Sequence, residues 1–142
     1  MDYNNILPVV LAGGKSKRFG EDKSQAKLGG KILIDYILYE LIDEFNEVLI
    51  VANDPIKHLS SGKITKIEDF QKNLGPLGGI LSSMKWVRKK NKSYKWIASF
   101  PSDTPFFNKI IFNNFLKKVN EKESELFFMN SNKKRHNIFG LW

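Results

Sequence analysis

The sequence predicts an α/β fold of three layers (α/β/α), in which helices cover both faces of a mostly parallel sheet. Short apolar runs that suit buried strands alternate along the chain with amphipathic patterns that suit helices. The chain has 142 residues and no repeat, low-complexity tract or Pro/Gly/Ser-rich linker, which is the organisation of one domain. We therefore expect a single domain over residues 1–142.

The first half of the chain contains three predicted strands and one predicted helix. Residues 8–12 ("PVVLA") read as a buried strand, with its proline tolerated as the first residue. Residues 31–45 should form an amphipathic helix, because their apolar positions recur with helical spacing. These positions are Ile34, Ile37, Leu38, Leu41, Ile42 and Phe45. Residues 47–52 and 63–68 read as the next two strands.

The second half continues the alternation. A helix is expected over residues 77–90, with Ile80, Leu81, Met84 and Val87 facing inward. Thr104 resembles an N-cap with Pro105 at the first helical position, which predicts a helix from there to about residue 120. Further strands are expected at residues 95–100, 125–129 and 137–142.

Composition narrows the class of protein. Cysteine is absent, which excludes disulfides, thiolate nucleophiles and cysteine-based zinc sites and fits a reducing compartment. The N-terminal segment lacks the basic start and the long apolar run of a signal peptide or membrane span. The net charge is +8, but the basic runs at residues 88–92 and 133–135 lack the aromatics of a single-strand-binding surface. We expect a cytoplasmic monomer that binds neither membranes nor nucleic acid.

Polar motifs follow four of the predicted strands. They are "GGKSKR" after the first strand, "AND" after the second, "ED" after the third and "PSD" after the fourth. In open parallel sheets, ligands bind outside the carboxyl ends of the strands, where the strand order reverses. These four motifs should therefore converge on one crevice.

The first of these loops, within residues 9–23 ("VVLAGGKSKRFGEDK"), suggests a polyphosphate site. It matches neither the Walker A motif nor G-x-G-x-x-G. Gly13 and Gly14 would let backbone N–H groups approach an anion closely. Arg18 and Lys23 add charges that can neutralise phosphate oxygens. The alternative is an ordinary glycine turn with solvated basic side chains.

A second glycine-rich segment, residues 74–83 ("LGPLGGILSS"), has two interpretations. Gly75 and Pro76 form a turn, and Gly78 and Gly79 fall in the first helical turn, where each glycine costs about 1 kcal/mol relative to alanine. Either a base or sugar approaches the helix start closely, or the helix packs tightly against a strand.

Asp103 follows the fourth large strand, where a carboxylate can bind a hard cation such as Mg²⁺ together with substrate phosphates. It could instead cap the next helix. Asp69 could be a second metal ligand or a charge that faces the phosphates, and Asn53 could bind a ribose or base; each could also be an ordinary loop residue. The two histidines, His58 and His136, read as surface residues. Glycines, cations and a carboxylate suit phosphoryl transfer, which depends on positioning and charge neutralisation.

The segment "LAGGKSKRFGEDK" resembles the signature of nucleotidyltransferases of the Rossmann-like nucleotide-diphospho-sugar transferase fold. Among these, the chain is most similar to the bacterial molybdenum cofactor guanylyltransferases. Six motifs occur in that family's order and spacing, and they begin at Leu11, Ala52, Ile67, Gly75, Pro101 and His136. Cytidylyl relatives more often have "LAAG" in the first loop and lack "GPLxG", so the resemblance favours guanine.

The resemblance implies transfer of GMP from GTP to the phosphate of molybdopterin, with Mg²⁺ bound and pyrophosphate released. In that scheme Leu11, Ala12 and Gly13 contact guanine or ribose, Asp69 faces the nucleotide, and Asp103 holds the metal. The catalytic candidates are Arg18, Lys23 and Asp103. The candidate nucleotide-binding residues are Leu11, Ala12, Gly13, Gly14, Lys23, Asn53, Asp69, Gly75, Gly78 and Asp103.

The chain departs from the family pattern at a few positions. Gly78 stands where alanine is usual, Ser102 where cysteine is frequent, and Asn137 where proline often follows the histidine. Family members continue beyond the position of Trp142, so we expect a domain truncated at its C-terminus. A cytidylyltransferase, a sugar-1-phosphate nucleotidyltransferase and a basic GTP- or nucleic-acid-binding module that truncation has inactivated remain as alternatives.

Overall fold

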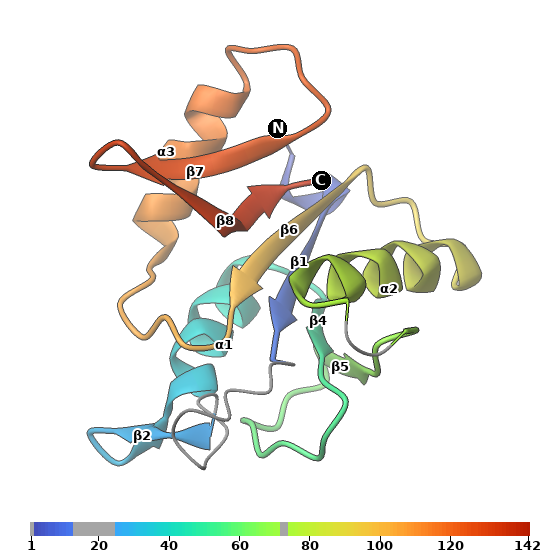
Figure 1. Ribbon diagram of the computed structural model, residues 1–142, viewed down its shortest axis with the longest axis vertical. Helices are drawn as coiled ribbons and strands as arrows, with labels where there is room; N and C mark the ends of the chain where they lie inside the picture. The colour runs from blue at the N-terminus through green and yellow to red at the C-terminus, as the bar shows by residue number, and fades with distance from the viewer. Residues whose placement is uncertain (1, 13–24, 72–73) are drawn as a thin grey trace.

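The computed structural model describes residues 2–12, 25–71 and 74–142. Its main feature is a six-stranded sheet of order β5-β4-β1-β6-β8-β7 (Figure 1). The strands are β1 (Ile6–Leu11), β4 (Val48–Val51), β5 (Ile64–Ile67), β6 (Trp96–Pro101), β7 (Phe127–Ser131) and β8 (Lys134–Leu141). Strands β5, β4, β1 and β6 are mutually parallel, whereas β8 pairs antiparallel with both β6 and β7. The predicted mostly parallel sheet is confirmed.

Helices cover both faces of this sheet, as predicted. Helices α1 (Leu33–Glu44) and α3 (Lys109–Val119) contribute to one apolar cluster, which includes Ile6 and Val10 of β1. Helix α2 (Pro76–Lys89) lies over the opposite face, where Trp86 and Val87 pack on a second cluster. Alternate residues of β1 point to the two faces, since side chains along a strand alternate.

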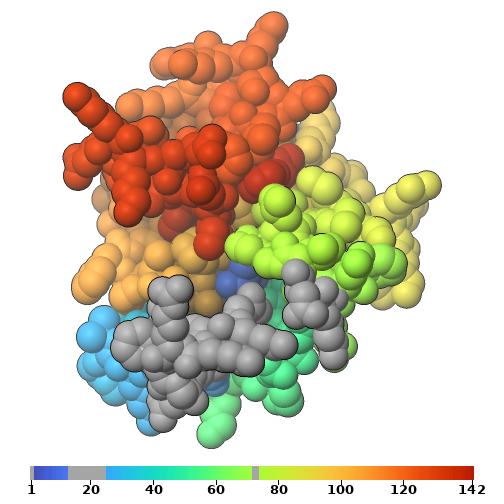
Figure 2. Space-filling model, viewed as in Figure 1, coloured from blue at the N-terminus to red at the C-terminus, as the bar shows by residue number. Residues whose placement is uncertain are grey.

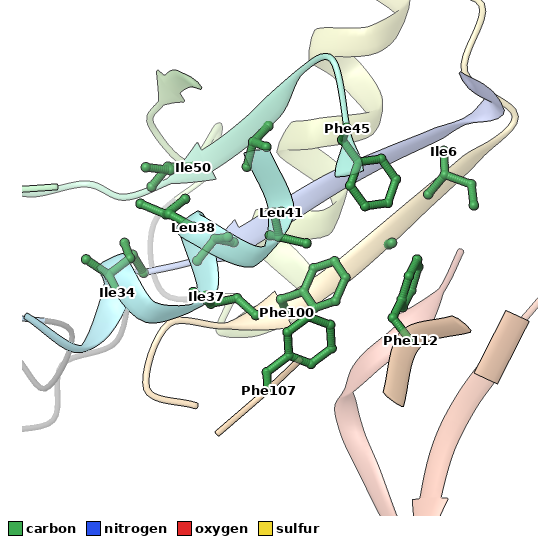
Figure 3. Packing of buried hydrophobic residues seen from close by; sticks show 14 of the residues in the cluster. Ile6, Ile34, Ile37, Leu38, Leu41, Phe45, Ile50, Phe100, Phe107 and Phe112 are labelled. Carbon is green, nitrogen blue, oxygen red and sulfur yellow. The ribbon is translucent and has the colours of Figure 1, made fainter. Parts of the chain in front are cut away.

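The larger cluster forms the main core (Figure 3). The predicted apolar stripe of α1 is buried at Ile34, Ile37, Leu38 and Leu41. Aromatic rings fill the space between β6 and α3, and Phe100 contacts Phe107 edge-on at 5.1 Å between ring centroids. This packing holds the end of β6, and the segment that follows it, in place.

The buried face of α2 differs from the prediction. Ile80 is buried, but Leu81 and Met84 are 39% and 43% exposed. The residues that face the sheet include Gly79 and Ser83, and these small side chains let the helix lie close to the strands. The buried Ser83 hydroxyl donates to the Gly79 carbonyl at 2.8 Å, so its burial leaves no polar atom unpaired. The predicted inward positions of Leu81 and Met84 are wrong.

Helix α3 begins later than predicted. Its N-cap is Asn108, whose side-chain oxygen accepts from the Ile111 N–H at 3.1 Å. Thr104 instead donates its hydroxyl to the Pro101 carbonyl at 3.1 Å, within a turn. Contacts with α1 explain the choice, because the Lys109 N–H donates to Glu40 at 2.9 Å. The predicted helix start at Thr104 and Pro105 is wrong.

A short hairpin before α1 was not predicted. Strands β2 (Lys27–Leu28) and β3 (Lys31–Ile32) pair antiparallel around Gly29 and Gly30. Both glycines have positive φ, +56° and +83°, as two-residue hairpin turns require. A 3₁₀ turn (Tyr3–Asn5) precedes β1. None of the helices in the described part of the chain is long and apolar enough to cross a membrane.

Candidate functional site

The four parallel strands end at the same edge of the sheet. Leu11 at the end of β1 pairs with Val51 of β4 on one side and with Pro101 of β6 on the other. The Ala12 N–H continues the ladder by donating to the Val51 carbonyl at 2.9 Å. The chain leaves β1 through α1 on one face and reaches β6 through α2 on the other. The end of β1 is therefore the topological switch point at which such folds bind ligands.

Asn53 and Asp69, from the loops after β4 and β5, lie against each other at this edge. The Asp69 backbone N–H donates to Asn53 Oδ1 at 2.9 Å, and Asn53 Nδ2 donates to Asp69 Oδ2 at 3.3 Å. Both residues are half-buried. The two hydrogen bonds orient the Asn53 amide, whose second N–H has no partner among the described residues. The predicted convergence of these two motifs is confirmed.

Ser82 of α2 completes this cluster, and sequence reasoning missed it. Its hydroxyl lies 3.4 Å from Asp69 Oδ1 and accepts from the Phe70 N–H at 2.7 Å. The same hydroxyl donates to the Gly78 carbonyl at 2.8 Å. No pattern in the sequence pointed to Ser82, because it lies on the helix face opposite the predicted apolar positions. Ser82 therefore joins α2 to the loop that carries Asp69.

Backbone conformation and close packing explain why glycines occur before and within α2. Gly75, the N-cap, has a φ of +62°, a region that disfavours other residues. A Cβ atom at Gly79 would lie 2.7 Å from Leu11 Cδ2, and one at Gly78 would lie 2.8 Å from Leu74 Cβ. Tight packing of the helix thus accounts for Gly79. Nucleotide contacts of Gly75 and Gly78 stay a prediction.

Asp103 lies on the other side of β1, after β6. Its side chain is exposed and makes no hydrogen bond or ion pair with any described residue. It does not cap α3, because Asn108 does. Within residues 2–12, 25–71 and 74–142 no three His, Cys, Asp or Glu side chains form a metal-binding group. A single unpaired carboxylate nevertheless suits Mg²⁺, which binds through one or two carboxylates plus substrate phosphates.

The structure thus places some of the candidate residues and leaves others unplaced. Leu11 and Ala12 end β1 at the switch point, and Asn53 with Asp69 lies beside them across β4. The candidates Gly13, Gly14, Arg18 and Lys23 lie outside the described residues.

Residues 8–142 match the family of MobA-like NTP transferase domains. The chain belongs to this family. A Bacillus cereus protein named "Probable molybdenum cofactor guanylyltransferase" is 30% identical over 148 residues, covering 94% of this chain and 72% of the relative. A protein of the same name from another Bacillus cereus strain is 32% identical over 118 residues, covering 80% of this chain and 56% of the relative. The chain therefore spans about half to three quarters of the length of these family members.

Solved structures confirm the family's fold. The molybdopterin-guanine dinucleotide biosynthesis protein A of Archaeoglobus fulgidus has a TM-score of 0.68 at 18% identity, over 96% of this chain and 66% of that one. The 2-C-methyl-D-erythritol 4-phosphate cytidylyltransferase of Francisella tularensis has a TM-score of 0.64 at 12% identity, over 96% and 68% of the two chains. At these identities the likeness concerns the fold alone.

Proposed function

We propose that this protein is a GTP:molybdopterin guanylyltransferase, which transfers GMP from GTP to the terminal phosphate of molybdopterin. The observation that carries the proposal is the position of Asn53, Asp69 and Asp103 on both sides of β1, at the switch point, in a chain of this family. A phosphate oxygen of the acceptor forms a bond to the α-phosphorus of GTP. The bond from the α-phosphorus to the bridging oxygen breaks, and pyrophosphate leaves.

The chain's own residues divide this work. The Asn53 amide, oriented by Asp69, binds the base or ribose, together with the backbone of Leu11 and Ala12. Gly13 and Gly14 provide backbone N–H groups to phosphate oxygens, and Arg18 and Lys23 provide positive charge for the triphosphate. These four assignments rest on sequence resemblance.

Asp103 is the residue proposed to hold Mg²⁺. Its carboxylate is exposed and unpaired among the described residues, so no existing interaction has to be broken before the ion binds. Mg²⁺ held there would supply positive charge to the phosphate oxygens and to the leaving group. Asp69 has a different role, because its carboxylate already contacts Asn53 and Ser82.

Isothermal titration of the chain with GTP, CTP, ATP and UTP in the presence of Mg²⁺ tests the proposal. GTP should bind most tightly, because the bases differ in the hydrogen-bonding groups at their edges. Tighter binding of CTP would point to a cytidylyltransferase. Salt-sensitive binding of RNA with no response to GTP would point to a basic nucleic-acid-binding module instead.

A further inference from the structure

The two edge strands of the sheet differ in how they are protected. Strand β5 ends the sheet on one side and carries Lys66, an exposed charge of the kind that keeps edge strands from pairing with another chain. Strand β7 ends the sheet on the other side, and its sequence, "FFMNS", contains no charged residue and no proline. In Figure 2 the β7–β8 hairpin (red) lies on the surface at the upper left of the molecule. Because β7 pairs only with β8 among the described strands, backbone groups along its other side are left for a further strand.

An apolar groove of about 550 Å³, which we call the α3–β7 groove, lies beside this edge between α3 and β7. Its walls include Phe115 of α3 and Phe127 and Met129 of β7, all of which are only half-buried. Ile111 of α3 also lines the groove and is 41% exposed. Exposed apolar side chains next to an unpaired strand are typical of a surface that another strand covers.

The segments on either side of β7 carry opposite charges. Residues 121–125 ("EKESE", the acidic segment) precede the strand with three glutamates and one lysine, whereas residues 133–135 ("KKR", the basic tip) follow it with three basic side chains. Both segments are exposed, and their side chains form no ion pair with any described residue. Asn132 and Lys133 have positive φ angles of +49° and +62°, which suit a two-residue hairpin turn and fix the position of the tip. An antiparallel strand pair between two copies would therefore bring the acidic segment of each copy to the basic tip of the other.

We propose that β7 pairs antiparallel with β7 of a second copy of the chain, which joins two sheets into one across a two-fold axis. The line along which the two strands pair is called the seam below. With the axis at Met129, Glu125 of one copy lies opposite Lys133 of the other, because these residues are equally far from Met129 in the sequence. This charge pair occurs twice, since the interface is symmetric. The α3–β7 grooves of the two copies lie on the same face of the joined sheet and meet at the seam, so apolar side chains of each copy are buried against those of the other.

The symmetry of this contact produces a closed dimer rather than a fibre. An antiparallel pair of identical strands uses the same edge of both copies, so no copy of β7 is left open. The outer edges of the joined sheet are then the two copies of β5, which Lys66 protects. Strands β8 and β6 separate the seam from the candidate nucleotide site, so this inference does not depend on the proposed function. We therefore expect a dimer in place of the monomer predicted from the sequence.

Sedimentation equilibrium of the full chain tests the proposal through two charge reversals. The unmodified chain should exchange between monomer and dimer at protein concentrations of about 1 to about 100 μM and should form nothing larger. Glu125→Lys and Lys133→Glu should each raise the dissociation constant of the dimer by roughly tenfold or more, because like charges then face each other at both ends of the seam. An equimolar mixture of the two variants should recover the dimer, because both facing pairs are then opposite in charge again.

Lys66→Glu is the matched control, because it makes the same charge change on the opposite edge strand. Its dimer dissociation constant should stay within about twofold of the unmodified value, since salt screens distant surface charges. A chain that stays monomeric over this concentration range would overturn the proposal. A dimer that Lys66→Glu weakens as much as Lys133→Glu, or a mixture of the two seam variants that stays monomeric, would overturn it as well. Thermal unfolding checks that the three variants fold, which we expect because all three side chains are exposed.

Discussion

Gly79 of α2 lies so close to Leu11 of β1 that a Cβ atom at Gly79 would be 2.7 Å from Leu11 Cδ2. The contact brings the first turns of α2 to the end of β1. Because Ser82 lies on the same helix, the contact also determines where its hydroxyl meets Asp69. The packing of one glycine therefore helps to build the candidate nucleotide site.

Gly79→Ala should lower the free energy of unfolding by about 1 to 2 kcal/mol relative to Gly78→Ala. Both changes gain about 1 kcal/mol of helix propensity, but the new methyl group at Gly79 meets the sheet, and overpacking costs about 1 to 3 kcal/mol. At Gly78 the nearest atom is Leu74 Cβ, at 2.8 Å, which belongs to the exposed segment before the helix rather than to the sheet. Urea denaturation of both variants measures the difference. Equal stabilities would show that α2 adjusts without strain.

Ser82→Ala should reduce GTP affinity by roughly fivefold or more relative to Ser83→Ala, because the hydrogen bond that Ser82 Oγ accepts from the Phe70 N–H, worth about 1 kcal/mol, holds the loop that carries Asp69. Both serines are buried and both donate to the carbonyl four residues earlier at 2.8 Å. Only Ser82 also contacts Asp69 and the Phe70 N–H. Isothermal titration measures GTP affinity, and thermal unfolding provides the stability of each variant. If affinity falls only in proportion to stability, Ser82 is a packing residue.

Asp103→Asn should make GTP binding independent of Mg²⁺, because a neutral amide is a poor ligand for a hard cation. Guanylyl transfer should fall by about a hundredfold, or about 2.7 kcal/mol of activation free energy. Titrations with and without Mg²⁺ measure the first effect, and pyrophosphate release the second. Glu123→Gln, an equal charge loss in the exposed segment after α3, is the control. An unchanged Mg²⁺ dependence in Asp103→Asn would move the metal site elsewhere.

Ionisation of Tyr94 should lower the free energy of unfolding at alkaline pH. Burial raises the pKa of Tyr94 above its usual value, and the hydrogen bond it donates to Glu47 at 2.8 Å and the charge of that carboxylate raise the pKa further. Because its pKa is raised, protonated Tyr94 contributes fully to the free energy of unfolding below about pH 10, the pKa of an unfolded tyrosine. This contribution is lost as the pH rises above that value.

Urea denaturation between about pH 8 and about pH 11 measures this effect against Tyr94→Phe, which cannot ionise at this position. The loss of stability above about pH 10 should be smaller in the variant than in the unmodified chain. Parallel curves for the two proteins would show that other groups, such as Tyr3, whose pKa burial also raises, cause the alkaline loss.

The sequence by itself determined the alternation of strands and helices, and it predicted the strand ends at which the candidate site residues lie. The stripe from Ile34 to Leu41 has helical spacing, and the apolar runs at β1 and β4 are typical of buried parallel strands. Both signals are local, since they depend on residues within a few positions of one another. The parallel topology then requires Asn53 and Asp69 to meet at one edge, because parallel strands all end on the same side.

Only the tertiary structure decided which residue caps α3 and which face of α2 is buried, because the sequence allowed more than one choice at each place. Thr104 and Asn108 are both suitable N-caps, and Asn108 is used where Lys109 meets Asp43 and Glu44 of α1 at 3.0 and 2.9 Å. The polar face of α2 is the buried one, because its small glycine and serine residues let the helix approach the sheet. The spacing of apolar residues along the helix could not predict this contact.

A groove of about 770 Å³ beside Asp103 has the same kind of origin. Its two walls are the segment from β6 into α3 and the β7–β8 hairpin, which α3 separates in the sequence and which the antiparallel pairing of β8 with β6 brings together. Ser82 likewise became part of the site when α2 docked on the sheet. Local patterns encode the elements, because they depend on short-range backbone and side-chain preferences. Contacts between elements depend on the shape and packing of the assembled core, so they emerge only when the chain has folded.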